Sequence, residues 1–227
     1  MDIVKYKSND RILLAVDCII FGFDGQQLKL LLIKRDFEPQ KGKWSLVGGF
    51  VSKNESVDDA AIRVLNKLTG FTDIYMEQLH CFGEVDRDTA GRVVSIAYYS
   101  LINIANYTEQ LADDHEAKWF EVESRPPLIF DHQLMVEKAL GHLREKITTH
   151  PIGFELLPAK FTLPQLQSLY EAIYGYPIDK RNFSKKILSL GILKKMKDKD
   201  MHSSKRGAYY YTISKTKNIL LPSRLNL

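Results

Sequence analysis

The sequence predicts a mixed α/β domain followed by a smaller domain of two helices and a β-hairpin. Predicted strands alternate with two amphipathic helices over residues 1–150, a pattern typical of α/β domains. After the segment His150-Pro151-Ile152-Gly153 the order changes to helix, turn, helix and hairpin, over residues 151–227. The charge changes sign at the same place. Residues 1–150 hold 18 Lys/Arg against 23 Asp/Glu, a net of −5, and residues 151–227 hold 14 against 5, a net of +9.

The strands of the first domain are predicted from apolar runs and turn residues. Residues 12–23 form a continuous apolar run typical of a buried strand, and Asp24-Gly25 supplies a tight turn into a return strand at residues 28–33. Further strands are expected at residues 73–85, 92–102 and 118–122.

Two helices complete this domain. Apolar residues recur at a spacing of three to four over residues 56–68, and Gly70 is suited to end that helix as its C-cap. The second helix is predicted to open at Asp131, as its N-cap, and to run to about Thr148.

The C-terminal domain has the element order of a winged helix-turn-helix. The segment Thr162-Leu-Pro-Gln165 predicts a capping box with proline in the first turn, and Gly175 ends that helix. A second helix is expected at residues 179–190, closed by Gly191. Residues 192–197 and 208–213 then form a hairpin around a polar turn.

The concentrated positive charge of this domain points to double-stranded DNA as partner. On the helix 179–190, Phe183, Ile187 and Leu190 share one face, polar and cationic residues lie on the other, and Leu188 is expected to pack under the wing. Side chains of these polar types reach base edges and phosphates from a recognition helix, and the turn at residues 202–207 is suited to gripping phosphate. The predicted DNA-binding residues are Lys180, Arg181, Asn182, Ser184, Lys185, Ser189, His202, Ser203, Ser204, Lys205 and Arg206. A solvated basic face or a protein-interaction module is the alternative; single-stranded RNA is disfavoured because no aromatic stacking platform lies on that helix.

Residues 31–71 resemble the Nudix family. Its motif, G-x5-E-x7-R-E-U-x-E-E-x-G-U with U a bulky apolar residue, is matched here by Gly49, Glu55, Arg63, Leu65, Gly70 and Phe71. The strand residues Leu31 to Arg35 and the segment Gly42 to Phe50 precede the motif at the family's spacing. The resemblance implies a Nudix-like fold with a small-molecule pocket beside the motif helix.

The three metal-binding glutamates of the motif are replaced by Val64, Lys67 and Leu68. In the family these carboxylates hold Mg²⁺ against a pyrophosphate, and valine and leucine offer no ligand atom while lysine repels the ion. We therefore expect no enzymatic activity, no catalytic residue, no metal and no cofactor. Retained hydrolysis would require Glu55, Asp58 or Asp59 to build a replacement site. Without its glutamate neighbours, Arg63 is expected to tether the helix to a loop.

The remaining motif residues predict where an effector binds. Gly48 and Gly49 allow close approach of the backbone, and Trp44 is expected to form a pocket wall, with core packing as the alternative. Polar residues near predicted strand ends complete the set. The predicted effector-binding residues are Arg35, Lys43, Trp44, Gly48, Gly49, Asp86, Asp88 and Arg92.

A degenerate Nudix domain followed by a basic winged helix resembles the Nudix-related transcriptional regulators over nearly the whole chain. The resemblance implies a ligand-responsive repressor that binds pseudo-palindromic operators as a homodimer. Such regulators control sugar catabolism or NAD metabolism. Because the metal ligands are absent and the domain is net negative, a neutral pentose, with L-arabinose first, is the leading expectation; ADP-ribose or a residual hydrolase is the alternative.

Other features of the sequence place the protein in the cytoplasm. The N-terminus lacks an apolar signal core, no stretch reaches the roughly 18 apolar residues of a membrane span, and no membrane partner is expected. Cys18 and Cys81 both lie in apolar runs and are expected to be buried thiols.

Overall fold

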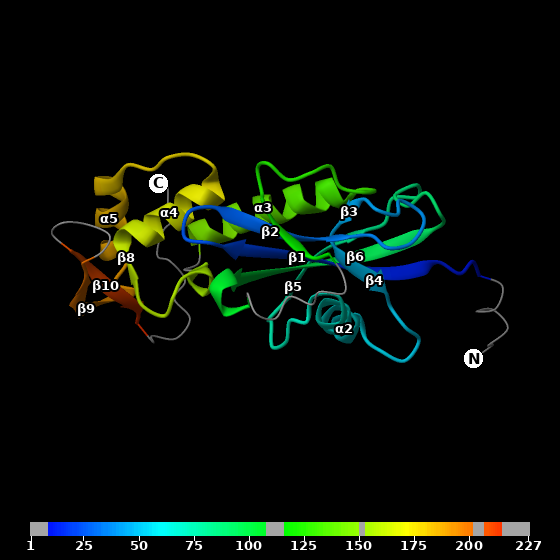
Figure 1. Cartoon of the computed structure of the whole chain (residues 1–227), viewed down its shortest axis with the longest axis horizontal. Coiled ribbons are helices and arrows are strands. Elements are labelled where there is room, and N and C mark those ends of the chain that lie inside the picture. The colour runs from blue at the N-terminus through cyan, green and yellow to red at the C-terminus, as the bar shows by residue number, and fades with distance from the viewer. Residues whose placement is uncertain (1–8, 108–115, 150–152, 202–206, 215–227) are drawn as a thin grey trace.

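The fold was determined as a computed structural model that describes residues 9–107, 116–149, 153–201 and 207–214. The N-terminal α/β unit forms one end of an elongated molecule, and the helices and small sheet of the C-terminal unit form the other (Figure 1). Within these ranges, no helix is both long enough and apolar enough to cross a membrane.

A seven-stranded mixed sheet forms the centre of the N-terminal unit. Its strands are β1 (Leu13–Phe23), β2 (Leu28–Lys34), β3 (Trp44–Ser45), β4 (Val47–Phe50), β5 (Glu77–Phe82), β6 (Val93–Asn103) and β7 (Lys118–Glu121). The main order is β3-β2-β1-β6-β5, with β4 also paired to β1 and β7 to β2. The pairing of β1 with β6 is parallel, and the other pairings are antiparallel.

The central strand β1 is buried on both faces, which explains why its sequence is apolar apart from Asp17. Successive side chains of a strand point to opposite faces. Accordingly, Ile19 and Phe21 belong to one core cluster, and Cys18 and Ile20 belong to the other. One helix covers each face of the sheet (Figure 1): α2 (Val57–Thr69) packs in the second cluster and α3 (His132–Thr149) in the first.

The structure confirms Gly70 as the C-cap of α2 and adds an N-terminal capping box that was not predicted. The Ser56 side chain accepts a hydrogen bond from the Asp59 amide, Asp59 completes a capping box, and Gly70 ends the helix with φ of 79°. At α3, Asp131 occupies the predicted position before the first helical residue, and its backbone carbonyl accepts a hydrogen bond from the Met135 amide. Its carboxylate binds Arg87.

The C-terminal unit has the predicted winged helix order. It contains η2 (Phe154–Leu156), β8 (Phe161–Thr162), α4 (Leu163–Tyr174), α5 (Lys180–Ser189), β9 (Leu193–Asp200) and β10 (Ala208–Ile213), and the small sheet has the order β8-β10-β9. Thr162 and Gln165 form the expected capping box of α4. The short strand β8 was not predicted, because two residues are too few to show the alternation of apolar and polar side chains that marks a strand.

The two units share one hydrophobic core. A single cluster of buried side chains runs from β1 and β2 through α3 to α4 and α5. It includes Leu143 and Ile147 of α3 beside Leu166 and Ile173 of α4 and Phe183 of α5. Arg144 strengthens the junction by donating from Nε to the Ile173 carbonyl at 2.8 Å. The predicted domain boundary falls on residues 150–152, which lie outside the described residues.

Three other expectations require correction. The strand predicted at residues 73–85 extends only over β5, and Tyr75 and Val85 beyond its ends are exposed. Cys18 is buried as expected, but Cys81 is exposed. Leu188 does not pack under the wing: it is 44% exposed on the outer surface of α5.

Candidate effector pocket and nucleic-acid interface

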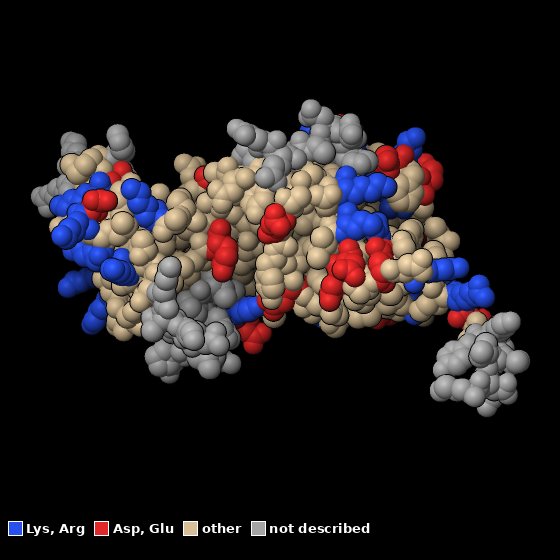
Figure 2. Space-filling model, turned by 90° about the horizontal axis from the view of Figure 1, so that it is seen from below, with Lys and Arg blue, Asp and Glu red and all other residues tan. Residues whose placement is uncertain are grey.

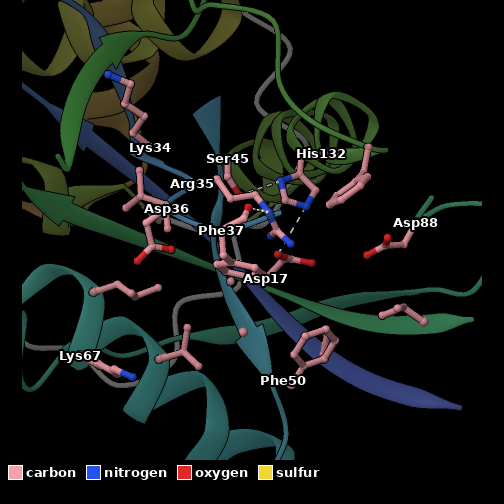
Figure 3. Close-up of a pocket in the computed structure, with 18 of the residues that line it drawn as sticks. Asp17, Lys34, Arg35, Asp36, Phe37, Ser45, Phe50, Lys67, Asp88 and His132 are labelled. Carbon is pink, nitrogen blue, oxygen red and sulfur yellow. Dashed lines mark hydrogen bonds and ion pairs between the residues drawn. The ribbon is translucent and has the colours of Figure 1, made fainter. Parts of the chain in front are cut away.

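A cavity of about 370 Å³ opens between the sheet, α2 and the first residue of α3 (Figure 3). This volume is in the range of sites that hold small molecules. Residues of β1, β2 and β4 line its floor, and the phenyl rings of Phe37, Phe50 and Phe130 line its sides. Phe37 and Phe50 are 51% and 46% exposed, so apolar surface is available to a ligand at the mouth of the cavity.

The motif helix α2 forms one wall. Val64, Lys67 and Leu68, at the three glutamate positions of the motif, all line the cavity. They share one helix face because residues three and four apart are neighbours on a helix. A site formed by a valine, a leucine and an ammonium group does not fit Mg²⁺, which requires oxygen ligands. The residues present therefore do not support the metal centre that the motif implies.

Arg63 tethers α2 to the preceding loop, as predicted. Its guanidinium donates to both carboxylate oxygens of Glu55, at 2.8 and 2.6 Å, and to the Phe50 carbonyl at 2.9 Å. The Ser52 amide adds a hydrogen bond to Glu55. Together these hydrogen bonds lower the pKa of Glu55 to about 2.

The carboxylates that could have built a replacement metal site are held elsewhere. Glu55 pairs with Arg63, Asp59 closes the capping box, and Asp58 accepts a hydrogen bond from the Tyr98 hydroxyl. None of the three lines the cavity.

The glycine pair of β4 brings backbone to the cavity surface. An ideal Cβ on Gly48 would lie 2.1 Å from Oδ1 of Asp17, and one on Gly49 would lie 2.9 Å from Cγ2 of Val64. Any larger residue at Gly48 would displace the Asp17 carboxylate. Glycine at this position therefore allows a buried carboxylate to lie under the backbone of the cavity floor.

A buried charge network supports that floor. Arg87 donates two hydrogen bonds to Asp131, at 2.9 and 2.7 Å, and its guanidinium lies 3.7 Å from Asp17. The Ser95 hydroxyl donates to Asp17 at 2.6 Å. The network joins β1, β6, the loop at residues 84–92 and the start of α3. Because each buried charge has a partner of opposite sign, the network can remain ionised.

His132, the first residue of α3, completes the network in its neutral form. Its Nδ1 accepts a hydrogen bond from the Leu46 amide at 3.1 Å, so its proton lies on Nε2, 3.6 Å from Asp17. Burial lowers the pKa of His132 below its ordinary value, and this effect outweighs the attraction of Asp17 and Asp131 for a proton.

The cavity lining is more positive than the domain around it. Five cationic side chains face three carboxylates, an excess of two positive charges, whereas residues 1–150 carry a net charge of −5. The cations are Lys34, Arg35, Arg63, Lys67 and Arg87, and the carboxylates are Asp17, Asp36 and Asp88. The lining is therefore less acidic than the domain as a whole, and three of its cations, Lys34, Arg63 and Arg87, pair with carboxylates outside it.

The structure brings together four of the eight predicted effector-binding residues: Arg35, Gly48, Gly49 and Asp88 line the cavity. The other four do not. Lys43 and Asp86 are exposed outside it. Trp44 packs edge-on against Phe120 at 4.7 Å, so the core-packing alternative holds. Arg92 donates to the carbonyls of Glu84 and Val93.

The cavity lining includes three residues that were not predicted from the sequence: Asp17, Arg87 and His132. Asp17 lies within an otherwise apolar strand, and Arg87 and His132 belong to no motif. A charged residue inside an otherwise apolar strand is a usable signal, because a buried carboxylate requires partners.

The predicted recognition helix α5 presents its polar residues outward. Lys180, Arg181, Asn182, Lys185 and Ser189 are exposed and Ser184 is half-buried, whereas Phe183 and Ile187 are buried. The ring of Phe183 lies against Tyr170 of α4, with 5.3 Å between ring centroids. These contacts hold the two helices of the helix-turn-helix together and leave the polar face of α5 free to enter a groove.

A second set of cations lies on the strand β9, where no DNA-binding residue was predicted. Lys194, Lys195, Lys197 and Lys199 are all exposed. The Nζ atoms of Lys195 and Lys199 lie 3.6 and 4.6 Å from the centroid of the Tyr209 ring. Lys and Arg gather at the end of the molecule that carries α5, β9 and β10 (Figure 2). The predicted turn residues His202, Ser203, Ser204, Lys205 and Arg206 lie outside the described residues.

The fold and the two sites define a Nudix domain joined to a DNA-binding winged helix domain. Comparison with known families agrees: residues 11–138 match the family model of the NUDIX domain, and residues 153–213 match that of the NrtR DNA-binding winged helix domain. The chain is 34% identical over 203 residues, 88% of its length and 81% of the relative's, to the ADPR responsive transcriptional repressor NtrR of Acinetobacter baylyi. The chain belongs to the NrtR family of Nudix-related transcriptional regulators.

Two solved structures of Shewanella oneidensis NrtR are also similar. The complex with a 27mer DNA has a TM-score of 0.78 and 31% identity, covering 88% of this chain and 93% of that one. The NUDIX domain complexed with ADP ribose has a TM-score of 0.53 and 32% identity, covering 63% of this chain and 99% of that one.

Proposed function

We propose that this protein is a transcriptional repressor whose affinity for operator DNA falls when ADP-ribose binds in the cavity beside α2. One observation carries the proposal. The lining of the cavity has more cations than carboxylates and no metal ligands at the motif positions, and the domain that contains it shares a hydrophobic core with a basic winged helix. The Acinetobacter relative and the complexed Shewanella domain, whose descriptions name ADP-ribose, support this effector.

The cavity favours ADP-ribose over the pentose expected from the sequence. A neutral sugar gains nothing from an excess of positive charge, whereas a pyrophosphate forms strong charge-assisted hydrogen bonds with Lys and Arg. The expectation of L-arabinose rested on a net-negative domain without compensating cations, and five cations line the cavity. The relatives reported above are described by ADP-ribose rather than by a sugar.

The helix α3 supplies a physical connection between effector and DNA. Its first residue, His132, lines the cavity, and Leu143 and Ile147 further along it pack against the core of the winged helix. A ligand that favours one position of α3 would alter the position of α5. A tenfold loss of operator affinity requires a coupling free energy of about 1.4 kcal/mol, within the usual allosteric range.

We further propose that the protein does not hydrolyse its effector. The support is the replacement of all three motif glutamates and the commitment of Glu55, Asp58 and Asp59 to other contacts. Incubation of ADP-ribose with the protein and Mg²⁺ should therefore release no nucleoside monophosphate. Release that chelation abolishes would show that a metal site is built from other residues.

The test of the regulatory proposal is fluorescence anisotropy with a labelled duplex. The full-length protein selects its operator from a random duplex library, and binding is then titrated without effector, with ADP-ribose, and with L-arabinose. ADP-ribose should raise the dissociation constant for DNA at least about tenfold, and L-arabinose should leave it unchanged. The opposite pattern would restore the pentose reading, and no response to either ligand would refute both.

The oligomeric state of the regulator is a second part of the proposal. We propose that it binds a pseudo-palindromic operator as a homodimer, because a two-fold protein matches a two-fold site. Light scattering after size-exclusion chromatography should give twice the mass of one chain.

We also propose that the target genes of this protein serve NAD metabolism. Chromatin immunoprecipitation with sequencing would test this, and binding only upstream of unrelated genes would contradict it.

A further inference from the structure

One cation of the cavity stands apart from the others. Lys67 projects from α2 at the edge of the cavity (Figure 3), and its side chain is exposed. It occupies one of the three motif positions at which Nudix hydrolases carry a metal-binding glutamate. On one face of α2, a positive charge thus replaces a negative one beside the same cavity.

Lys67 also differs from the other cations of the lining in its contacts. The other four cations each have partners: Glu116 for Lys34, the carbonyls of Phe37 and Pro39 for Arg35, Glu55 for Arg63, and Asp131 for Arg87. Lys67 has no hydrogen bond or ion pair within the described part of the chain. An ammonium group offers three donors, so all three are available to a ligand.

The chemistry of the exchange indicates what Lys67 does. Magnesium held by three carboxylates brings positive charge to a pyrophosphate, but the complete site has a net charge of minus one. Lysine between valine and leucine gives plus one at the same place and repels a divalent cation. Its neighbours Val64 and Leu68 are apolar and line the cavity beside it, so neither offers an oxygen ligand to a metal ion.

We propose that Lys67 holds the pyrophosphate of the effector in place of the metal ion, so that ADP-ribose binds without Mg²⁺. This inference rests on the proposed function. It makes Lys67 the residue that turns a metal-dependent substrate site into a metal-independent sensor site. The loss of the glutamates then both removes hydrolysis and retains recognition of the pyrophosphate.

Isothermal titration calorimetry of the full-length protein with ADP-ribose tests the proposal. The wild type should bind with the same affinity, within about twofold, in EDTA and in millimolar Mg²⁺. Lys67→Gln should lower the affinity at least about tenfold, equivalent to about 1.4 kcal/mol. Lys67→Arg should retain most of it, because the charge remains. Lys53→Gln removes an exposed lysine outside the cavity and should have no effect.

Adenosine, which lacks the pyrophosphate, provides a second measurement. Its affinity, measured by competition, should be the same for the wild type and Lys67→Gln. Equal ADP-ribose affinities for these two proteins, or binding that EDTA abolishes, would overturn the role of Lys67 while leaving ADP-ribose as effector. A wild type that binds no ADP-ribose in either buffer would overturn the proposed function itself.

Discussion

Gly48 shows how a single missing methyl group shapes the cavity. Its backbone lies over the Asp17 carboxylate, which is only 5% exposed and is oriented by Arg87, Ser95 and His132. The same glycine belongs to a sequence motif that suggests only close approach to a ligand. In the structure the neighbour of Gly48 is the buried carboxylate of Asp17. A side chain at position 48 would therefore collide with the protein interior as well as with a ligand in the cavity.

Gly48→Ala should therefore destabilise the fold. The new methyl group would displace Asp17 from its partners, and we expect a loss of about 2 kcal/mol in the free energy of unfolding, typical of overpacking. Urea denaturation followed by circular dichroism measures it. Gly91→Ala is the matched control, because an added Cβ there meets nothing within 4 Å. Equal stability of the two variants would show that Asp17 moves without cost.

His132 should make the stability of the protein depend on pH. Burial lowers its pKa in the folded state, whereas the unfolded residue titrates at about 6.5. Below that pH the unfolded state binds the additional proton, so the free energy of unfolding falls as pH is lowered through about 6.5.

Comparison of the wild type with His132→Asn isolates this effect from that of the other histidines. Between pH 7.5 and 5.5 the wild type should lose more stability than the variant in urea denaturation. The side-chain carbonyl of asparagine can still accept the hydrogen bond from the Leu46 amide, but asparagine has no group that titrates in this range. Parallel pH profiles would show that His132 does not contribute.

At the scale of elements, α3 combines two roles. One of its faces fills the core of both units, and its first residue lines the cavity beside α2. Its composition is not ideal for a helix, since Gly141 lies in the middle of it and is exposed. Glycine there increases the entropy of the unfolded chain without contributing a contact.

Gly141→Ala should stabilise the protein by about 0.5–1 kcal/mol, the difference in helix propensity between the two residues. The added Cβ meets nothing within 4 Å, so no steric cost opposes the gain. The melting temperature and the urea midpoint should both rise. A decrease in either would indicate that the outer surface of α3 is covered by a partner, such as a second subunit.

The helix α5 and the strand β9 contribute differently to DNA binding. Polar groups of α5 can read bases, whereas lysines of a strand provide charge without sequence information. We expect Lys195→Gln to weaken binding to all duplexes equally and to reduce the slope of log K against log salt by about 0.9. Anisotropy titrations at several salt concentrations measure both. Lys53→Gln removes an exposed lysine of the N-terminal unit and serves as control. An unchanged slope for Lys195→Gln would exclude a phosphate contact at Lys195.

At the scale of the whole molecule, the continuous core makes the two units interdependent. Both tryptophans, Trp44 and Trp119, lie in the Nudix unit, so tryptophan fluorescence reports that unit alone. Ile173 is fully buried in α4, in the part of the core that the winged helix contributes. Removing atoms there leaves a cavity that destabilises everything packed around it.

Ile173→Ala should thus lower the free energy of unfolding by about 3 kcal/mol. The urea midpoint of the tryptophan fluorescence transition should fall accordingly. Circular dichroism, which also reports α4 and α5, should give the same midpoint as fluorescence. If the fluorescence transition stayed at its wild-type position while the ellipticity changed earlier, the two units would unfold separately. The coupling route through α3 would then lose its basis.

Most of the elements, the fold class and the loss of the metal ligands follow from the sequence alone. Each of these depends on residues close together in the chain: the three-to-four spacing of α2 and its C-cap Gly70, the capping box of α4, and the replacements at Val64, Lys67 and Leu68. Local patterns of this kind are set by the geometry of a single helix or strand.

The composition of the pocket, on which the proposed effector rests, follows from the packing of the chain in three dimensions. Asp17, Arg87 and His132 come from segments far apart in the chain, and their contacts follow from the pairing of β1 with β6 and the packing of α3. The net charge of the domain said nothing about the sign of the charge at the cavity surface. A domain with an excess of carboxylates can still concentrate its cations around one hollow, because folding, rather than composition, determines which charges share a surface.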